Sequence, residues 1–245
     1  MVRRRRRRRS VIRPLWRALW AIALAFVALT TVPVWVLRWV DPPTSSVMLF
    51  ARLEQHLRGD GVAAALHHEW VPWSRIPPVM ALAVVAAEDQ RFADHAGFDW
   101  VEVRRAWADY QAGERLRGAS TISQQVAKNL FLWHGRHLVR KGLEAWFTLL
   151  IEALWPKSRI LAVYLNIAQL GPTTYGVGAA SWRFFDRPAE ALTTQQAALL
   201  AAVLPNPVRY RAEAPSPYVK RRAAWIRRQM ERLGGVDHLQ RLESY

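Results

Sequence analysis

The sequence predicts a mostly α-helical domain that follows one N-terminal membrane-spanning helix. Three observations support this fold class: residues 18–37 carry no charge, apolar segments after residue 74 recur with helical spacing, and the alternating β-branched pattern of strands is nearly absent. The chain of 245 residues is 51% hydrophobic and 22% charged, so it can bury one sizeable core and is not a disordered chain.

The N-terminal segment combines a basic tail, residues 1–17, with an apolar anchor, residues 18–40. The anchor's uncharged core is long enough to cross about 30 Å of hydrocarbon as a helix. Indole rings favour the membrane interface, and tryptophans lie at both ends of the core, at Trp16, Trp20, Trp35 and Trp39. The run Arg3 to Arg9 favours a cytoplasmic N-terminus and export of the rest. A cleaved signal peptide is the alternative, but the apolar run is longer than its usual core.

The net charge of +16 is concentrated at the same end of the chain. Residues 1–40 hold ten Arg and no acid, which leaves 25 basic against 19 acidic residues elsewhere. Because membrane topology already explains the Arg run, we expect no nucleic-acid partner. A basic membrane-tethered binding protein stays as an alternative, based on that run and the arginines at 221–222 and 227–228. The chain has no cysteine, which excludes disulfides and thiol chemistry.

Residues 41–73 form a predicted linker and entry to a domain that spans residues 74–245. The linker begins with a turn-rich stretch, has helical periodicity over residues 48–57, and becomes polar and aromatic over residues 67–73, as in a loop or short strand. Prolines at 77 and 78 are typical of a helix entry. Eight helices are then predicted, over residues 79–90, 100–111, 121–130, 138–155, 157–169, 175–185, 193–203 and 218–233.

A carboxylate pair, Glu88-Asp89, ends the first of these helices. Its preceding residues, Ala81 to Ala87, are all apolar, so the helix is predicted to be largely buried. A carboxylate at the end of a buried helix is desolvated, which raises its pKa toward a value useful for proton transfer. The alternative is a surface pair that merely ends a core helix. The residues that follow at defined spacing favour a site: Phe92, His95, Gly97 and Asp99.

A second polar motif runs from Gly118 to Asn129 and opens with a Gly-Ala-Ser-Thr turn. Thr121 and Gln124 are three residues apart, the spacing of a helix capping box. Lys128 lies four residues after Gln124 on the same helix face, where an ammonium group can bind a phosphate. Capping accounts for Ser120, Thr121 and Gln124, but it gives no reason for Gln125, Lys128 and Asn129.

Two further motifs add charged and polar groups. Arg140, Lys141 and Glu144 are spaced to share one helical surface, and Arg136 precedes them as another candidate phosphate ligand. Taken alone, this is the pattern of a solvated ion-pair cluster. Tyr164 and Asn166 follow within an apolar helix and are expected to organise the floor of a site by hydrogen bonding. A fifth block, residues 197–207, is apolar and ends in a rigid Pro-Asn-Pro stop.

These five motifs, in this order, resemble the peptidoglycan glycosyltransferases of family 51, over about residues 70–230. Within that family the chain is similar to the monofunctional members. The resemblance implies a mostly α, lysozyme-like glycosyltransferase lobe with a small membrane-facing jaw. It implies an enzyme that joins lipid II, the undecaprenyl-pyrophosphate disaccharide-peptide, into β-1,4 glycan chains by inverting transfer from a lipid-linked donor. It also implies an inner (cytoplasmic) membrane protein with a periplasmic catalytic domain.

The resemblance further implies a two-sided site. Glu88 is expected to take the proton of the acceptor hydroxyl, and Glu144 to act on the pyrophosphate side. Four cations are expected to neutralise the pyrophosphate, Lys128, Arg136, Arg140 and Lys141. Ser120 and Gln124 are expected to position the donor. The other motif residues are expected to be structural near the site: Asp89, Phe92, His95, Gly118, Thr121, Gln125, Asn129, Tyr164 and Asn166.

No cluster of His and Asp has the spacing of a dedicated metal site, so no tightly bound cofactor is expected. Mg²⁺ or Mn²⁺ would bind together with the substrate pyrophosphate. Expected partners are lipid II, the growing lipid-linked strand, the membrane and other cell-wall synthesis proteins. Residues 130–133 are predicted to dip into the bilayer, with residues 70–73 as a weaker candidate.

Two positions depart from the family pattern, Gln169 and Phe184-Phe185, and they bear on finer substrate contacts. One other enzyme class stays open, a lytic lysozyme-like glycosidase. Such an enzyme protonates a sugar leaving group with a carboxylic acid. The basic residues of the second and third motifs argue against this class, because a glycosidase has no pyrophosphate to neutralise.

Overall fold

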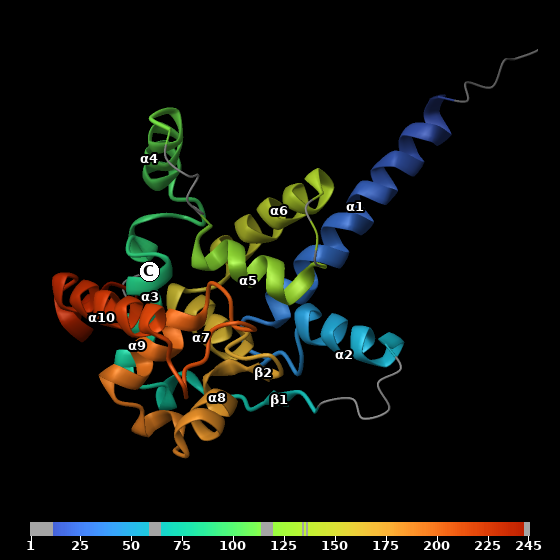
Figure 1. Cartoon of the computed structure of the whole chain (residues 1–245). Helices are drawn as coiled ribbons and strands as arrows, with labels where there is room; N and C mark the ends of the chain where they lie inside the picture. Colours follow the sequence, from blue (N-terminus) through green and yellow to red (C-terminus); the bar gives the residue numbers. More distant parts are fainter. Residues whose placement is uncertain (1–11, 59–64, 114–119, 134, 136, 243–245) are drawn as a thin grey trace, which may run out of the picture.

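The computed structural model describes residues 12–58, 65–113, 120–133, 135 and 137–242, and this part of the chain is mostly helical, as predicted (Figure 1). The first helix, α1 (Ile12–Val36), extends away from the body of the protein. Its segment Pro14–Val36 is long and apolar enough to cross a membrane. The structure therefore agrees with the predicted anchor, and Pro33 is accommodated within the helix.

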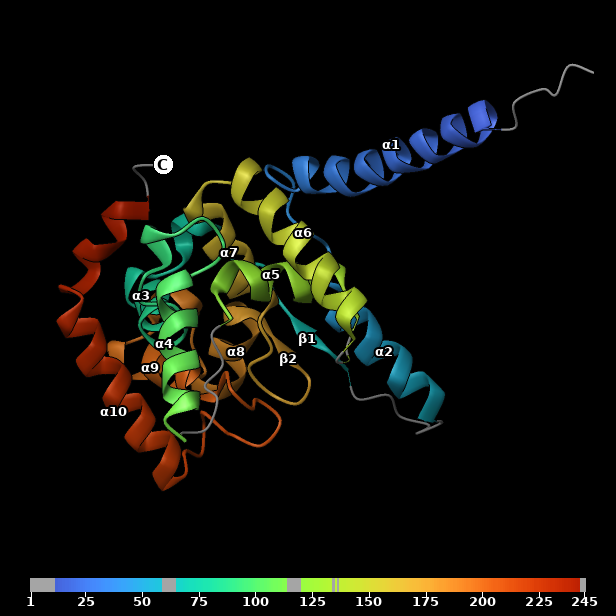
Figure 2. The same ribbon diagram turned by 90° about the horizontal axis from the view of Figure 1, so that it is seen from above.

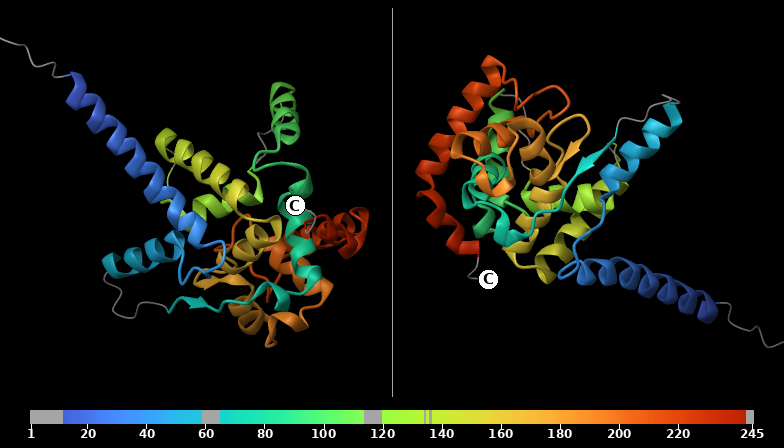
Figure 3. Two further views of the ribbon diagram at one scale, coloured as in Figure 1. Left: turned by 180° about the vertical axis from the view of Figure 1, so that it is seen from behind. Right: turned by 90° about the horizontal axis from the view of Figure 1, so that it is seen from below.

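The last turns of α1 pack against α6 (Leu138–Leu154), as seen from behind in Figure 3. The Trp146 indole N–H donates to Oγ1 of Thr30 at 3.1 Å. The Trp155 indole N–H donates to the carbonyl of Val34 at 2.7 Å. Val34 is fully buried although it belongs to the anchor. These contacts hold the end of the anchor on the domain.

A second attachment joins the end of the anchor to α7 (Lys157–Ile167). The Arg159 guanidinium donates to the carbonyls of Leu37 and Val40 and pairs with Asp41 at 2.6 Å. Leu37 and Val40 lie in the turn that follows α1, where backbone carbonyls have no partner within the helix. The guanidinium supplies hydrogen bonds to both of them. The anchor and the domain are thus joined by directional bonds to backbone atoms.

The core of the domain lies around α3 (Pro78–Glu88), α7 and α9 (Thr194–Val203). Every residue from Met80 to Ala86 is buried, which confirms the prediction of a buried α3. Pro78 begins this helix, where a missing N–H costs nothing. The last long helix, α10 (Pro217–Arg232), packs on both α3 and α9 (Figure 1).

The remaining elements surround this core. They are α2 (Ser46–Arg58), α4 (Trp100–Gln111), α5 (Ile122–Phe131), α8 (Gly176–Phe185), and short 3-10 helices at Trp73–Arg75, Phe92–Asp94, Ala189–Ala191 and Gly235–Leu242. The eight helices predicted after residue 74 are all present, with ends that differ by at most two residues, whereas α1 begins six residues before and ends four residues before the predicted anchor. For example, α3 ends at Glu88 rather than at Gln90, because the chain turns there into the first motif.

Two short strands cross the lower part of the domain. β1 (His67–His68) pairs in parallel with β2 (Thr174–Tyr175), with His67 opposite Thr174. Nearby, the buried amide of Asn166 accepts a hydrogen bond from the Val71 N–H at 2.7 Å and donates to its carbonyl at 2.9 Å. Asn166 therefore fastens the segment before α3 to α7.

The prediction that residues 130–133 dip into a bilayer is wrong for most of the segment. Leu130 and Leu132 are buried, and Phe131 stacks on Phe147 with ring centroids 4.5 Å apart. The weaker candidate, residues 70–73, also packs on the core. Apolar spacing alone does not distinguish a core contact from a membrane contact, and here the side chains face the fold.

The exposed apolar side chains of the domain instead gather on other elements. α4 stands off from the body (Figure 3) and has no buried residue along its whole described length. One face of α4 carries residues spaced three and four apart, Trp100, Val103, Trp107 and Tyr110. The start of α6 adds Leu138 and Val139, both largely exposed. These surfaces lie on the same side of the body as α1 (Figure 1).

Candidate active site

Glu88, at the end of α3, is the central group of the site. Its Oε2 accepts a hydrogen bond from the side-chain amide of Gln125 on α5 at 2.9 Å. On the other side, Nη2 of Arg222 on α10 lies 3.8 Å from its Oε1. Burial raises the pKa of Glu88, while the Gln125 hydrogen bond and the charges of Arg222 and Lys128 lower it. The net direction is upward, which agrees with the desolvation expected from the sequence.

Gln125 is itself oriented by Tyr164 on α7. The Tyr164 hydroxyl donates to Oε1 of Gln125 at 3.2 Å, so the amide nitrogen of Gln125 points to Glu88. Burial raises the pKa of Tyr164 well above its ordinary value, which keeps the hydroxyl a donor. The structure thus places both residues in one chain of hydrogen bonds that ends on the carboxylate.

The polar residues of the first motif build the start of α5. The Asp89 carboxylate contacts Nε2 of His95 at 2.9 Å and accepts from the Ile122 N–H at 3.0 Å. The free N–H groups at a helix start favour a carboxylate. Phe92, which is fully buried, packs in the same region. Asp89 therefore links the end of α3 to the beginning of the helix that carries Gln125.

Gly97 supplies a second link to the same helix start. Its carbonyl accepts from the Thr121 hydroxyl at 2.6 Å. Its φ of +88° lies in the left-handed region, and an added Cβ would meet Cγ2 of Thr148 at 2.7 Å. Both observations explain why a glycine stands in this position of the motif.

The predicted capping box is present. Thr121 caps α5, and the side-chain oxygen of Gln124 accepts from the Thr121 N–H at 3.0 Å. Gln124 is thus engaged in the cap and mostly buried, whereas Ser120 is exposed beside it. Gly118 lies outside the described residues. Asn129 is half-buried on α5, and its carbonyl accepts from the Ser46 hydroxyl at 3.0 Å.

The predicted cation cluster forms around Glu144 at the start of α6. Nη1 of Arg140 lies 2.7 Å from Oε2 of Glu144, and the Lys141 ammonium pairs with Oε1. Glu144 is only 3% exposed, so it is a buried acceptor rather than a surface partner. Lys128 adds a third cation, and burial lowers its pKa while Glu144 raises it. Arg136 lies outside the described residues.

These groups follow one another along α5. Thr121 caps the start of the helix, and Gln125 contacts Glu88 one turn later. Almost one turn further, the charges of the Glu144 cluster shift the pKa of Lys128. Each turn advances about 5.4 Å along the axis. The helix therefore sets the half-buried Glu88 carboxylate close to a group of three cations that share one acid, Glu144.

One group of His and Asp residues lies close together in the fold, although its spacing in the sequence is not that of a dedicated metal site. The fold brings possible ligand atoms of Asp89, His95 and Asp99 within 4.8 Å of one another. Both carboxylates already have protein partners, however. Asp89 caps α5, and Asp99 accepts from the N–H groups of Val101 and Glu102 to cap α4. Asp89 and Asp99 therefore serve as helix caps, and His95 contacts Asp89 through Nε2.

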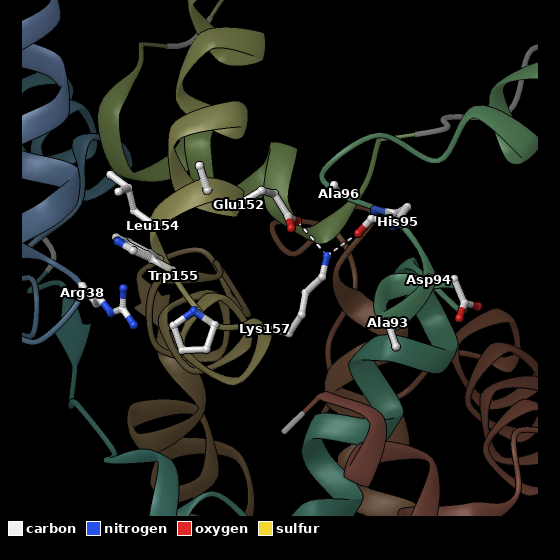
Figure 4. Close-up of a pocket in the computed structure, with 11 residues that line it drawn as sticks. Arg38, Ala93, Asp94, His95, Ala96, Glu152, Leu154, Trp155 and Lys157 are labelled. Atoms are coloured by element: carbon white, nitrogen blue, oxygen red, sulfur yellow. Dashed lines mark hydrogen bonds and ion pairs between the residues drawn. The ribbon is translucent and has the colours of Figure 1, made fainter. Parts of the chain in front are cut away.

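A cavity of about 470 Å³ adjoins the first motif, and its lining includes His95, Glu152 and Lys157 but not Glu88 (Figure 4). Its buried Lys157 donates to the carbonyl of His95 at 2.6 Å and pairs with Glu152 at 2.8 Å. The same ammonium lies 4.4 Å from the centre of the Phe92 ring. This network braces the loop between α3 and α4, and it explains why Phe92 and His95 belong to the motif.

Two groups of residues near the site were not predicted from the sequence. Arg222 follows Glu88 by more than 130 residues and lies in a basic stretch with no distinguishing pattern. Lys157 and Glu152 belong to what reads as an ordinary helix boundary. Helical spacing within one element cannot show a contact between α3 and α10, so no signal in this single sequence identifies these residues.

Comparison with known proteins gives one consistent result. The family model described as transglycosylase matches residues 57–231. The biosynthetic peptidoglycan transglycosylase of Pseudomonas aeruginosa is 51% identical over 95% of this chain and 100% of its own length. The protein of the same name from Aeromonas hydrophila is 52% identical over 94% of this chain and 96% of its own length. That of Xanthomonas campestris is 52% identical over 96% and 94%, respectively.

Proposed function

The chain belongs to the transglycosylase family, and from this premise we propose how its residues polymerise peptidoglycan glycan strands. The enzyme is a peptidoglycan glycosyltransferase that joins lipid II into β-1,4 chains by inverting transfer from a lipid-linked donor. One observation supports the assignment of roles most strongly: α5 contacts the half-buried Glu88 carboxylate through Gln125 and carries Lys128 to a cation cluster suited to a pyrophosphate.

Glu88 is the proposed general base. An alcohol is a weak nucleophile, so its proton must leave as the new bond forms. The acceptor 4-hydroxyl oxygen bonds to C1 of the donor sugar, its proton passes to the Glu88 carboxylate, and the bond from C1 to the pyrophosphate oxygen breaks. The raised pKa of Glu88 supports this role, because it brings the base closer to neutral pH. Gln125 and Tyr164 hold the carboxylate in place.

The cation cluster is proposed to receive the leaving group. A departing pyrophosphate needs neutralisation of its charge, and guanidinium and ammonium groups supply it through charge-assisted hydrogen bonds. Lys128, Arg140 and Lys141 are the described cations of this cluster, and Arg136 is proposed to join them. Glu144 is proposed to orient Arg140 and Lys141, whose charged groups it already contacts. Ser120 and Gln124 are proposed to position the donor.

Among the described residues of this cluster, Glu144 is the one acid that could bind a divalent cation. Both carboxylate oxygens of Glu144 already face cationic side chains. A Mg²⁺ or Mn²⁺ ion would therefore take its ligands mainly from the phosphates of the substrate, and we assign no step to it. No tightly bound cofactor is part of the proposed reaction.

The anchor is proposed to place the domain on the periplasmic face of the inner membrane, with the N-terminus in the cytoplasm. The apolar helix α1 supports membrane attachment, and the run Arg3 to Arg9 supports this orientation. Because lipid II is itself held in the membrane, an anchored domain stays close to its substrate. Other cell-wall synthesis proteins are proposed as partners, since strand synthesis and cross-linking act on one polymer.

The function is tested by replacing the base. Glu88→Gln should lower the rate of lipid II polymerisation by roughly 10²- to 10⁴-fold, because the amide cannot accept the proton. Purified full-length enzyme would be assayed with lipid II and the strands resolved on a gel. Glu213→Gln, an exposed glutamate that pairs with Arg211 before α10, is the matched control and should keep the wild-type rate.

Unchanged folding and lipid II binding in Glu88→Gln would exclude a structural cause. A wild-type rate in that variant would overturn the role of Glu88. Release of saccharide fragments from purified sacculi by the wild-type enzyme would instead favour the lytic glycosidase. Tight duplex binding by residues 41–245 at physiological salt would favour the basic binding protein.

A further inference from the structure

The cavity of about 470 Å³ beside the first motif also reaches the end of the anchor. Arg38, two residues after α1 ends, lines it, and so does Trp155, whose indole N–H donates to the carbonyl of Val34. Figure 2 shows the end of α1 next to the end of α6. The volume lies within the range of small-molecule sites, roughly 300–1,000 Å³. Among the described residues, none of the groups proposed to act on lipid II lines this cavity.

The charged side chains around the cavity leave one positive charge unmatched. Lys157 and Glu152 pair with each other, with 2.8 Å between Nζ and Oε1. Asp94 pairs with Arg241. Arg38 lines the same cavity, and no acidic side chain in the described part of the chain pairs with it. An anion is therefore the ligand whose charge this cavity would balance.

The position of Arg38 sets this charge at the edge of the membrane. The apolar segment of the anchor ends at Val36, and the exposed Trp35 and Trp39 lie on either side of that end. Indole rings in such positions favour the zone of the lipid headgroups. The Arg38 guanidinium lies 5.2 Å from the centre of the Trp39 ring. The anions that are concentrated in this zone are the phosphate groups of membrane lipids.

The uncharged part of the lining is mostly apolar, which a free inorganic anion does not require. Its apolar residues are Ala93, Ala96, Ala153, Leu154, Trp155 and Pro156. Figure 4 shows Arg38 on the anchor side of the cavity, next to Trp155, with Asp94 on the opposite side. A phosphate that carries a glycerol and the first carbons of acyl chains would cover such a wall, and the chains would stay in the bilayer beside α1.

We propose that this cavity binds the headgroup of an anionic phospholipid from the leaflet that the domain faces. Arg38 binds the phosphate, and the apolar wall holds the glycerol. A lipid bound here contacts the end of the anchor, α6, α7 and the loop after α3, because residues from all four line the cavity. It therefore adds to the attachment of the domain at the membrane. The inference goes beyond the proposed polymerase function and does not depend on it.

The test titrates the full-length enzyme in detergent with phosphatidylglycerol and counts bound lipids by native mass spectrometry. Arg38→Ala should weaken the tightest binding roughly 10-fold, because one charge-assisted contact is lost. Arg17→Ala, an exposed arginine near the other end of α1, is the matched control and should keep the wild-type affinity. Ala153→Trp, at an exposed position of the lining, should also weaken binding, because the indole fills the cavity. Diacylglycerol, which has no phosphate, should bind at least 10-fold more weakly than phosphatidylglycerol.

Wild-type affinity for phosphatidylglycerol in both Arg38→Ala and Ala153→Trp would overturn the site, and so would equal binding of diacylglycerol. Displacement of the lipid by inorganic phosphate would overturn it as well, because the ligand would then be a free anion. Both variants should polymerise lipid II within about twofold of the wild-type rate. Absence of any polymer with the wild-type enzyme would instead overturn the polymerase function and leave the lipid site standing.

Discussion

At the scale of single residues, the properties of Glu88 depend on neighbours from α5 and α10. Burial raises its pKa, and the hydrogen bond from Gln125 opposes that rise. The carboxylate must be ionised to accept a proton, so activity is expected to fall as the pH falls through this raised pKa. Each neighbour that favours the ionised form therefore extends activity toward lower pH.

Gln125→Ala provides the test at this scale. Loss of the hydrogen bond removes an interaction that lowers the pKa of Glu88, so the pKa should rise further. The acidic limb of the kcat/KM profile should then move to higher pH, measured with lipid II across a pH series. Asn129→Ala, one turn beyond on α5, is the matched control, because its side chain makes no hydrogen bond to Glu88 in the described part of the structure. An unmoved limb, or one moved to lower pH, would contradict this account.

At the scale of elements, α5 is held at its start by the motif that precedes it. Thr121 caps the helix and donates to Gly97, and Asp89 accepts from Ile122. The helix then carries Gln125 toward Glu88 and Lys128 toward the cations. The capping residues Thr121 and Asp89 thus position Gln125 and Lys128, which belong to the proposed site.

Two capping boxes in the chain allow a matched comparison. Thr121→Ala should lower the free energy of unfolding by about 1–3 kcal/mol, from the lost cap and the unpaired Gly97 carbonyl. Thr193→Ala removes the exposed capping box of α9 and should cost about 1 kcal/mol. Thermal unfolding checks both values. Only Thr121→Ala should also reduce polymerisation, since α9 carries none of the proposed catalytic groups. Equal activities in the two variants would show that the start of α5 does not position the site.

At the scale of the whole molecule, the anchor is bonded to the domain rather than loosely tethered. Arg159 binds the carbonyls of Leu37 and Val40, and Trp155 binds that of Val34. We expect a domain held in this way to keep a defined height and orientation over the membrane. For a lipid-linked substrate, that height would decide whether C1 and the acceptor hydroxyl reach the proposed base, Glu88.

Arg159→Ala tests this consequence. The variant should lose roughly 10- to 100-fold of its activity on lipid II in liposomes, because a small misplacement of reacting groups is costly. The loss should be much smaller in detergent micelles, where the substrate adapts its position. Arg38→Ala, an exposed arginine just beyond α1, is the control and should be active in both media. The same loss in liposomes and micelles would point to damage within the domain instead.

Most of the helices and the five motifs could be predicted from the sequence, because helix caps, apolar spacing and proline stops act within a few residues. The Thr121–Gln124 capping box and the Arg140, Lys141 and Glu144 cluster are of this local kind, and the structure contains both. The prediction that residues 130–133 face the membrane was wrong because it depends on tertiary packing. Leu130 and Leu132 are buried by residues that pack against them, and local spacing does not show this.

The sequence by itself determined the apolar anchor, the helical class of the domain and the family motifs that carry the acid and the cations. Only the tertiary structure decided that Arg222 faces Glu88, that Arg159 binds the end of the anchor, and that Arg38 lines one cavity together with Lys157. The physical reason is distance along the chain. Helix periodicity specifies a face of one element, whereas these contacts join elements more than 100 residues apart, whose relative positions only the packed core specifies.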